Sequence, residues 1–178
     1  MVRGTFFISP GPGVPPLAPP NSMSGLKRKS AVVPTTYQCT DDPSDRDLAV
    51  VDAGLGHFNA SEPELRNVRP LCVFARDASG QITGGAVGRT WGQCCELQQL
   101  WVAEDARGQG VGAELMIGFE EQALLRGCSL IYLDTFSFQA RPFYERLGYG
   151  VVLQTTGFTG GIVKYTMHKK LERAQTGA

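Results

Sequence analysis

The sequence has no apolar run that approaches the ~18 to 20 residues a membrane-spanning helix requires. Its N-terminal stretch is short of basic residues, and prolines interrupt the brief apolar part well below the length of a signal-peptide core. No small-residue cleavage pattern follows. These absences predict a cytoplasmic protein with neither a membrane partner nor a removable leader.

Net charge is also absent, because 17 Lys and Arg balance 17 Asp and Glu. Without an overall field, nothing draws the chain toward nucleic acid, and we expect no such partner. No metal site is expected either, because the two histidines, His57 and His168, lie far apart and have no partners at ligand spacing. Each is predicted to lie on the surface or on a strand face.

The five cysteines are an odd number, and they are spread through predicted strands. Cys94 and Cys95 are neighbours on one strand, so their side chains point to opposite faces, which disfavours a mutual disulfide or a shared metal. We interpret the cysteines as small apolar side chains in a reducing compartment, in agreement with a cytoplasmic location.

Prolines are concentrated at one end, with seven of the eleven within residues 1–34, a stretch without apolar periodicity. Such a stretch cannot bury enough surface to offset its ordering entropy, so it is predicted to be a disordered arm. Met23 within it leaves the translation start open between Met1 and Met23. Residues 35–172 are long enough for one domain with a real core, and residues 173–178 are predicted to be a flexible tail.

The remaining chain mixes strand and helix patterns separated by glycine and proline. Ser44 or Asp45 is expected to cap the first helix, and Glu120 and Glu121 are expected to face outward from the second. Helices are expected over residues 44–58, between the glycine run and Gly127, and within 139–150. Strands are expected over residues 35–40, 70–77, 81–91, 94–102, 129–136, 150–156 and 162–169. The order predicts an antiparallel first half and one β-α-β unit in the second.

Three glycines, Gly108, Gly110 and Gly112, stand just before the second helix. Glycine is a poor helix former, so the run indicates a backbone that approaches a ligand closely, and a helix N-terminus favours an anion. A nucleotide-triphosphate loop is excluded, because no Gly-Lys-Ser/Thr follows the glycines.

A dinucleotide-binding loop, and hence a nicotinamide-dependent oxidoreductase, is an open alternative. Gly108, Gly110 and Ala113 satisfy G-x-G-x-x-A, and Asp134 ends a strand about 20 residues later. Two features oppose it. The residues "AEDAR" intervene between Val102 and the glycines, and the unit follows a hairpin and has only one crossover.

The segment "RGQGVG", residues 107–112, fits R/Q-x-x-G-x-G, and "ARPFYERLGYG" downstream fits a second pattern, a-x-x-F/L-Y-e-k-l-G-F. Over residues 35–171 the sequence resembles the GNAT superfamily of N-acetyltransferases. The resemblance implies an α/β (α+β) fold with a mixed, V-splayed central sheet of about seven strands flanked by helices. It also implies acetyl-CoA as cosubstrate, and direct attack on it in a ternary complex by a primary amine of a small molecule or peptide.

The resemblance also assigns candidate residues for binding acetyl-CoA. The pantetheine arm is expected to pair with Leu100, Trp101 and Val102. The pyrophosphate loop is expected to comprise Arg107, Gly108, Gln109, Gly110, Val111, Gly112 and Ala113. Ser137 stands where many relatives have an asparagine that contacts pantetheine, but it can equally cap the helix near Phe138, which is the interpretation we favour.

Tyr144 is the candidate general acid, beside the thioester sulfur, because a tyrosine with a pKa of about 10 is protonated at neutral pH. Glu96, six residues before Val102, is the candidate general base; a solvated glutamate and a water chain are the alternative. No cysteine stands at a recognised nucleophile position, so no covalent acyl-enzyme is expected. The family's acceptor pocket would draw on residues 57–70.

Three questions stay open at this point. The amine acceptor is unidentified, because fold does not fix substrate. The oligomeric state is undetermined, and a homodimer is one possibility. The chain could also be a non-catalytic acyl-CoA-binding module that kept the loop but lost turnover.

Overall fold

The structure is a computed structural model that describes residues 35–63 and 67–172. The predicted arm (1–34) and tail (173–178) lie outside the described residues. The chain divides into two compact units between Ser61 and Glu62. None of the helices in the described ranges is long and apolar enough to cross a membrane.

The first unit contains helix α1, Asp45–Asn59. Ser44 caps it, as predicted: its side chain accepts from the Asp47 backbone N–H at 3.1 Å and donates to the Asp47 carboxylate at 2.7 Å. The strand expected over residues 35–40 is wrong, because this segment has no regular structure and Tyr37 is 93% exposed. Strand propensity yields a strand only where a partner strand is available to pair.

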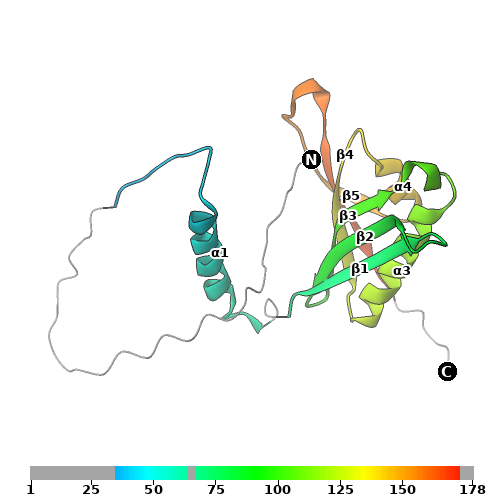
Figure 1. The fold of residues 1–178 in the computed structure, drawn as a ribbon, viewed down its shortest axis with the longest axis horizontal. Coiled ribbons are helices and arrows are strands. Elements are labelled where there is room, and N and C mark those ends of the chain that lie inside the picture. Colours follow the sequence, from blue (N-terminus) through cyan, green and yellow to red (C-terminus); the bar gives the residue numbers. More distant parts are fainter. Residues whose placement is uncertain (1–34, 64–66, 173–178) are drawn as a thin grey trace. The chain divides into compact units, whose positions relative to one another are not determined.

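The second unit is built on a six-stranded sheet in the order β1-β2-β3-β4-β6-β5 (Figure 1). Its strands are β1 (Arg69–Arg76), β2 (Ile82–Trp91), β3 (Cys94–Val102), β4 (Leu130–Phe136), β5 (Gly150–Thr155) and β6 (Lys164–Lys170). Helices α3 (Val111–Leu125) and α4 (Arg141–Arg146) accompany them. Only β3 and β4 run parallel, and α3 connects them, which confirms the mixed class and the single β-α-β unit.

Helix α3 packs against β1, β2 and β3 with Leu115, Met116, Phe119 and Ala123 buried (Figure 1). The expectation that Glu120 faces outward is wrong. Its carboxylate pairs with Lys169 Nζ at 2.6 Å and accepts from the Tyr149 hydroxyl at 3.0 Å. Lys169 lies on β6 and Tyr149 just before β5, so these partners come from far along the sequence, and the helical periodicity could not reveal them.

Strands β3 and β4 pair over only four residues before they separate. The parallel register joins Cys94–Leu97 to Leu130–Leu133, although β3 continues to Val102 and β4 to Phe136. On its other side β3 carries a bulge at Gln98, because Gly88 pairs with Leu97 while Val87 pairs with Gln99. A bulge bends its strand and increases its twist, and this is the V-splay that the fold prediction contained.

Gly88 permits this bulge. A Cβ atom added there would collide with the Glu96 backbone oxygen and would lie 2.8 Å from the Phe119 ring. Only a residue without a side chain lets β3 and the α3 aromatic approach β2 this closely.

We expect Gly88→Ala to lower the free energy of unfolding by about 1–3 kcal/mol, because the β3 backbone or the Phe119 ring must shift. Chemical denaturation followed by circular dichroism measures it. Gly118→Ala within α3 is the matched control, since its Cβ would make an ordinary 3.5 Å contact with Val73. That variant should gain up to about 1 kcal/mol from helix propensity. Equal stabilities for the two variants would contradict the close approach at Gly88.

Candidate active site

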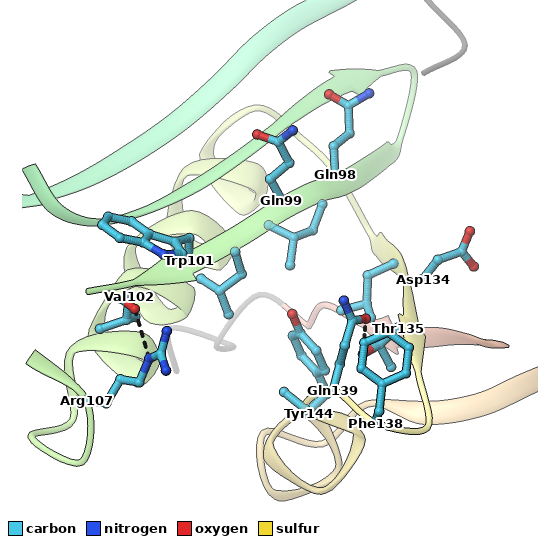
Figure 2. Close-up of a pocket in the computed structure, with 14 residues that line it drawn as sticks. Gln98, Gln99, Trp101, Val102, Arg107, Asp134, Thr135, Phe138, Gln139 and Tyr144 are labelled. Carbon is cyan, nitrogen blue, oxygen red and sulfur yellow. Dashed lines mark hydrogen bonds between the residues drawn. The ribbon is translucent and has the colours of Figure 1, made fainter. Parts of the chain in front are cut away.

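A groove of about 570 Å³ opens where β3 and β4 separate, and we call it the inter-strand groove (Figure 2). One wall is β3 from Leu97 to Val102, and the other is formed by β4 and the segment that leads into α4. Its lining is Leu97, Gln98, Gln99, Leu100, Trp101, Val102, Arg107, Leu133, Asp134, Thr135, Phe138, Gln139, Ala140 and Tyr144. The groove therefore follows directly from the loss of strand pairing after Leu97.

A second groove of about 490 Å³, the loop groove, lies at the glycine run and the start of α3. It shares Leu100, Val102, Arg107 and Ala140 with the inter-strand groove, so the two grooves adjoin, and we call them together the channel. The other lining residues are Ala106, Gly108, Gly110, Val111, Gly112, Ala113, Phe143 and Arg146.

The glycine loop has the geometry of an anion site. Gly108 and Gly110 adopt positive φ angles of 74° and 85°, which favour glycine, and a Cβ at either would point into open space. Helix α3 starts with Ala113 and Glu114 donating to the Gly110 carbonyl, at 2.9 and 3.1 Å. The N–H groups of Val111 and Gly112 precede these bonds and have no acceptor among the described residues. Such amides, at the positive end of a helix dipole, suit a phosphate.

Packing does not require a glycine at position 112. A Cβ there would lie 3.5 Å from the Phe143 ring, an ordinary contact. Two side-chain hydrogen bonds to backbone carbonyls hold the loop in its conformation. The Arg107 Nε donates to the Val102 carbonyl at 3.1 Å, and the Gln109 side chain donates to the Asp105 carbonyl at 2.8 Å. Arg107 thus lines both grooves, whereas Gln109 lines neither.

The β3 backbone is half-paired along the channel. Residues Gln99 to Val102 pair with β2 on one side, and past Leu97 no described strand pairs with β3 on the other. Unpaired strand edges bind extended chains that carry amide groups. Leu100, Trp101 and Val102 lie on this edge, where the sequence predicted contacts with an extended arm.

Tyr144, on α4, has a buried ring and a hydroxyl that faces the inter-strand groove (Figure 2). Phe143 and Tyr149 hold the ring by edge contacts, at 5.2 and 5.8 Å between centroids. Within the described residues no group hydrogen-bonds the hydroxyl. Burial raises the pKa of Tyr144 to about 12, so at neutral pH the group is a proton donor.

Glu96 lies on β3 just before the divergence, and it does not line either groove. Its carboxylate accepts from the Arg89 Nε at 2.6 Å and from the Gln98 amide at 3.3 Å. The structure therefore brings Tyr144 to the groove and leaves Glu96 beside it in an ion pair. The role of Glu96 as a base stays a prediction.

Ser137 does not cap a helix, because α4 begins at Arg141 with Ala140 at its N-cap position. Instead, its hydroxyl accepts from the Val163 N–H at 3.2 Å, and its own N–H donates to the Val163 carbonyl at 2.8 Å. These bonds extend the pairing of β4 with β6 by one residue, an interaction that sequence reasoning could not foresee. Ser137 lines neither groove.

Sequence reasoning missed several residues that line the inter-strand groove. The adjacent glutamines Gln98 and Gln99 break the alternation of polar and apolar residues along β3, and this break was the available signal for the bulge. Asp134 was considered only as a strand-end residue; it lies within β4, with its carboxylate bound to Lys164 and Thr166, both at 2.6 Å. Phe138 and Gln139 gave no signal, because only the path between β4 and α4 brings them to the groove.

Comparison with known proteins agrees with this geometry. The model of the acetyltransferase (GNAT) family matches residues 38–149, and the chain belongs to that family. Blasticidin-S acetyltransferase of Streptomyces morookaense is 36% identical over 111 residues, which are 60% of this chain and 82% of that protein.

Solved structures agree as well. A crystal structure from Agrobacterium tumefaciens, provisionally described as an acetyltransferase, matches with a TM-score of 0.70 and 27% identity, over 77% of this chain and all of that one. An aminoglycoside 6′-N-acetyltransferase solved with coenzyme A shares the fold, with a TM-score of 0.53 and 22% identity over 68% of this chain and 81% of that one.

The protein is therefore an N-acetyltransferase that uses acetyl-CoA. The dinucleotide alternative fails on topology, because the strands around the glycine loop belong to a mixed sheet in which β4 is followed by antiparallel β6. All five cysteines are free; Cys95 and Cys128 are buried, as expected of small apolar side chains, whereas Cys39 and Cys72 are exposed.

We expect Gly110→Ala to weaken coenzyme A binding at least about tenfold, or about 1.4 kcal/mol, because it forces a non-glycine residue into a positive-φ turn and places a methyl group over the loop amides. Gly127→Ala is the matched control, with a φ of 86° against 85° and equally open surroundings, at the far end of α3. Both should lose similar stability, and calorimetric titration with coenzyme A should separate them. Equal affinities would show that the loop does not hold the nucleotide.

Proposed function

We propose that the protein transfers the acetyl group directly from acetyl-CoA to a primary amine, with both substrates bound at once in the inter-strand groove. The observation that carries this proposal is the Tyr144 hydroxyl, which faces the groove beside the unpaired edge of β3 and is bonded to no described residue. A channel that holds donor and acceptor together needs no acyl-enzyme. Holding two reactants in this way removes much of the entropic cost of their meeting.

Each of the two grooves fits one part of acetyl-CoA. The amides of Val111 and Gly112, with Arg107 beside them, would hold the pyrophosphate in the loop groove. The free edge of β3 at Leu100 to Val102 would pair with the pantetheine amides and direct the arm toward Tyr144. Bound acetyl-CoA supplies a thioester as the acetyl source.

Tyr144 would then act as the general acid. Its raised pKa keeps the proton on the phenol oxygen at neutral pH, so the phenol would donate a hydrogen bond to the sulfur and share this proton as negative charge develops on the departing thiolate. The hydroxyl can donate without first breaking a bond to the protein. A backbone N–H on the β3 edge would stabilise the charge that develops on the acetyl oxygen.

Two candidates remain for removing the proton from the amine. Glu96 lies on β3 near the apex of the V, held in one orientation by Arg89. Since Glu96 does not line the groove, it would act through an intervening water, and a water chain alone is the alternative.

The acceptor is proposed to be a small-molecule amine. The relative named for blasticidin S supports a small-molecule acceptor, and blasticidin S is the first compound to screen. A peptide amine is the alternative. Acceptor contacts from residues 57–70 stay a prediction, because this stretch includes residues 64–66, outside the described ranges. A cytoplasmic location is also proposed, on the evidence of the five free cysteines.

Tyr144→Phe should lower kcat by about 10²-fold or more and leave coenzyme A affinity unchanged, because it removes the donated proton and keeps the ring. Release of free thiol from acetyl-CoA in the presence of amine measures the rate. Tyr149→Phe is the matched control: it also removes a buried phenol, but one whose hydroxyl is bonded to Glu120. That variant should lose stability and keep its kcat relative to wild type. If Tyr144→Phe retains full kcat, Tyr144 is not the acid.

Glu96→Gln tests the base. If Glu96 takes the proton, the variant loses about 10²-fold of kcat/KM together with the acid limb of the wild-type pH profile. Glu145→Gln is the matched control, because it also removes an arginine partner, at 2.7 Å in α4, outside both grooves. If the pH profile is unchanged in Glu96→Gln, water rather than Glu96 accepts the proton from the amine.

A further inference from the structure

Three phenylalanines form a cluster that we call the aromatic wall: Phe136 on β4, Phe138 after it, and Phe158 in the β5–β6 connection. Phe138 is the member that lines the inter-strand groove. The rings of Phe136 and Phe138 are stacked, with centroids 5.5 Å apart and planes within 12°. Phe158 meets Phe136 edge-on at 5.4 Å and 84°. Each ring is therefore fixed by another before any ligand arrives.

The outermost ring is the exposed one. Phe138 is 69% exposed, although one of its faces is covered by Phe136, and it is a lining residue of the groove. A large apolar ring that is held rigid and left open to water costs free energy, and a stacked partner would recover it. The wall is continuous with the channel in which the acetyl group would be transferred, so the partner that fits this place is the acceptor.

A carboxylate stands beside the wall. Asp134 precedes Phe136 by two residues on β4, so the two side chains leave the same face of the strand. Among the described residues that line the inter-strand groove, Asp134 is the only acid. One oxygen accepts from the Thr166 hydroxyl and the other pairs with Lys164, which fixes the carboxylate in place, and each oxygen keeps one further acceptor position.

The opposite wall, formed by β3, includes two polar side chains among apolar ones. Gln98 and Gln99 line the groove from β3, and in Figure 2 their carboxamides extend to the side of β3 away from Tyr144 and Phe138. Arg107 lies at the other end of the channel, with the glycine loop. The channel thus has a cationic end, suited to phosphate, and an end with the Asp134–Lys164 ion pair, two amides and an aromatic face.

From this arrangement we infer that the acceptor is an amine that carries a flat ring, with the ring stacked on Phe138 and a cationic group directed to Asp134. The inference rests on the proposed function and names the substrate class of the same site. It makes Phe138 a residue that determines specificity, and Phe158 a residue that positions it through Phe136.

Two amines of equal charge and similar size test the inference: 2-phenylethylamine, whose ring is flat, and 2-cyclohexylethylamine, whose ring is puckered. Thiol release gives kcat/KM for each at saturating acetyl-CoA. We expect wild type to prefer the flat ring about tenfold, which is the range of an aromatic stacking contact. Phe138→Ala should abolish the preference by raising KM for 2-phenylethylamine, with KM for acetyl-CoA unchanged. Phe138→Trp should keep the preference, and Phe158→Ala should weaken it.

Leu125→Ala is the control, because Leu125 is 76% exposed on α3 and lines neither groove. It should leave both rates and the preference unchanged. Asp134→Asn should raise KM for both amines equally, since both carry one ammonium group. These two variants separate the effect of the ring from the effects of charge and of general surface change.

The outcomes are distinguishable. If wild type acetylates both amines equally, or if Phe138→Ala keeps the preference, the inference is overturned while the proposed function stands. If neither these amines nor blasticidin S is acetylated, although coenzyme A binds, the proposed function fails and the inference fails with it. A tenfold preference that disappears only in the aromatic-wall variants supports both.

Discussion

Strand β3 pairs with β4 over four residues and then continues alone, and every functional feature of the molecule depends on that separation. The bulge at Gln98 turns β3 away from β4, and Gly88 gives the bulged backbone room to lie against β2. A sheet continuous to Val102 would leave no inter-strand groove and no free backbone edge. It would also enclose the space that the Tyr144 hydroxyl now faces.

The channel is organised by charge along its length. At one end, amides at the start of α3 and the guanidinium of Arg107 provide a positive environment for phosphates. At the other end lie the Asp134 carboxylate, which is paired with Lys164, and two carboxamides, and we propose that this end takes the cationic group of the acceptor. Because the chain carries no net charge, this local separation of sign, rather than an overall field, would orient the two substrates.

Tyr144 and Tyr149 lie close together in the sequence, but the role of Tyr149 is structural, whereas the proposed role of Tyr144 is chemical. Tyr149 gives its hydroxyl hydrogen to Glu120, which also binds Lys169, so it joins α3 to the β5–β6 side of the sheet. Tyr144 packs against Tyr149 but gives its hydroxyl to no described residue. Burial raises the pKa of both phenols, yet only Tyr144 faces the groove and remains available to a substrate.

The sequence by itself determined the features whose causes are local. The glycine loop, α3 and its buried face, the Ser44 cap and the β1–β2 hairpin follow from backbone freedom, periodicity and capping, which neighbouring residues decide. Tertiary structure alone decided which strands find partners, so residues 35–40 form none and the sheet has six strands. It also decided that Ser137 hydrogen-bonds to Val163 and that Glu120 forms an ion pair with Lys169, and it brought Phe138 and Asp134 to the groove. These contacts join residues that only the folded sheet brings together.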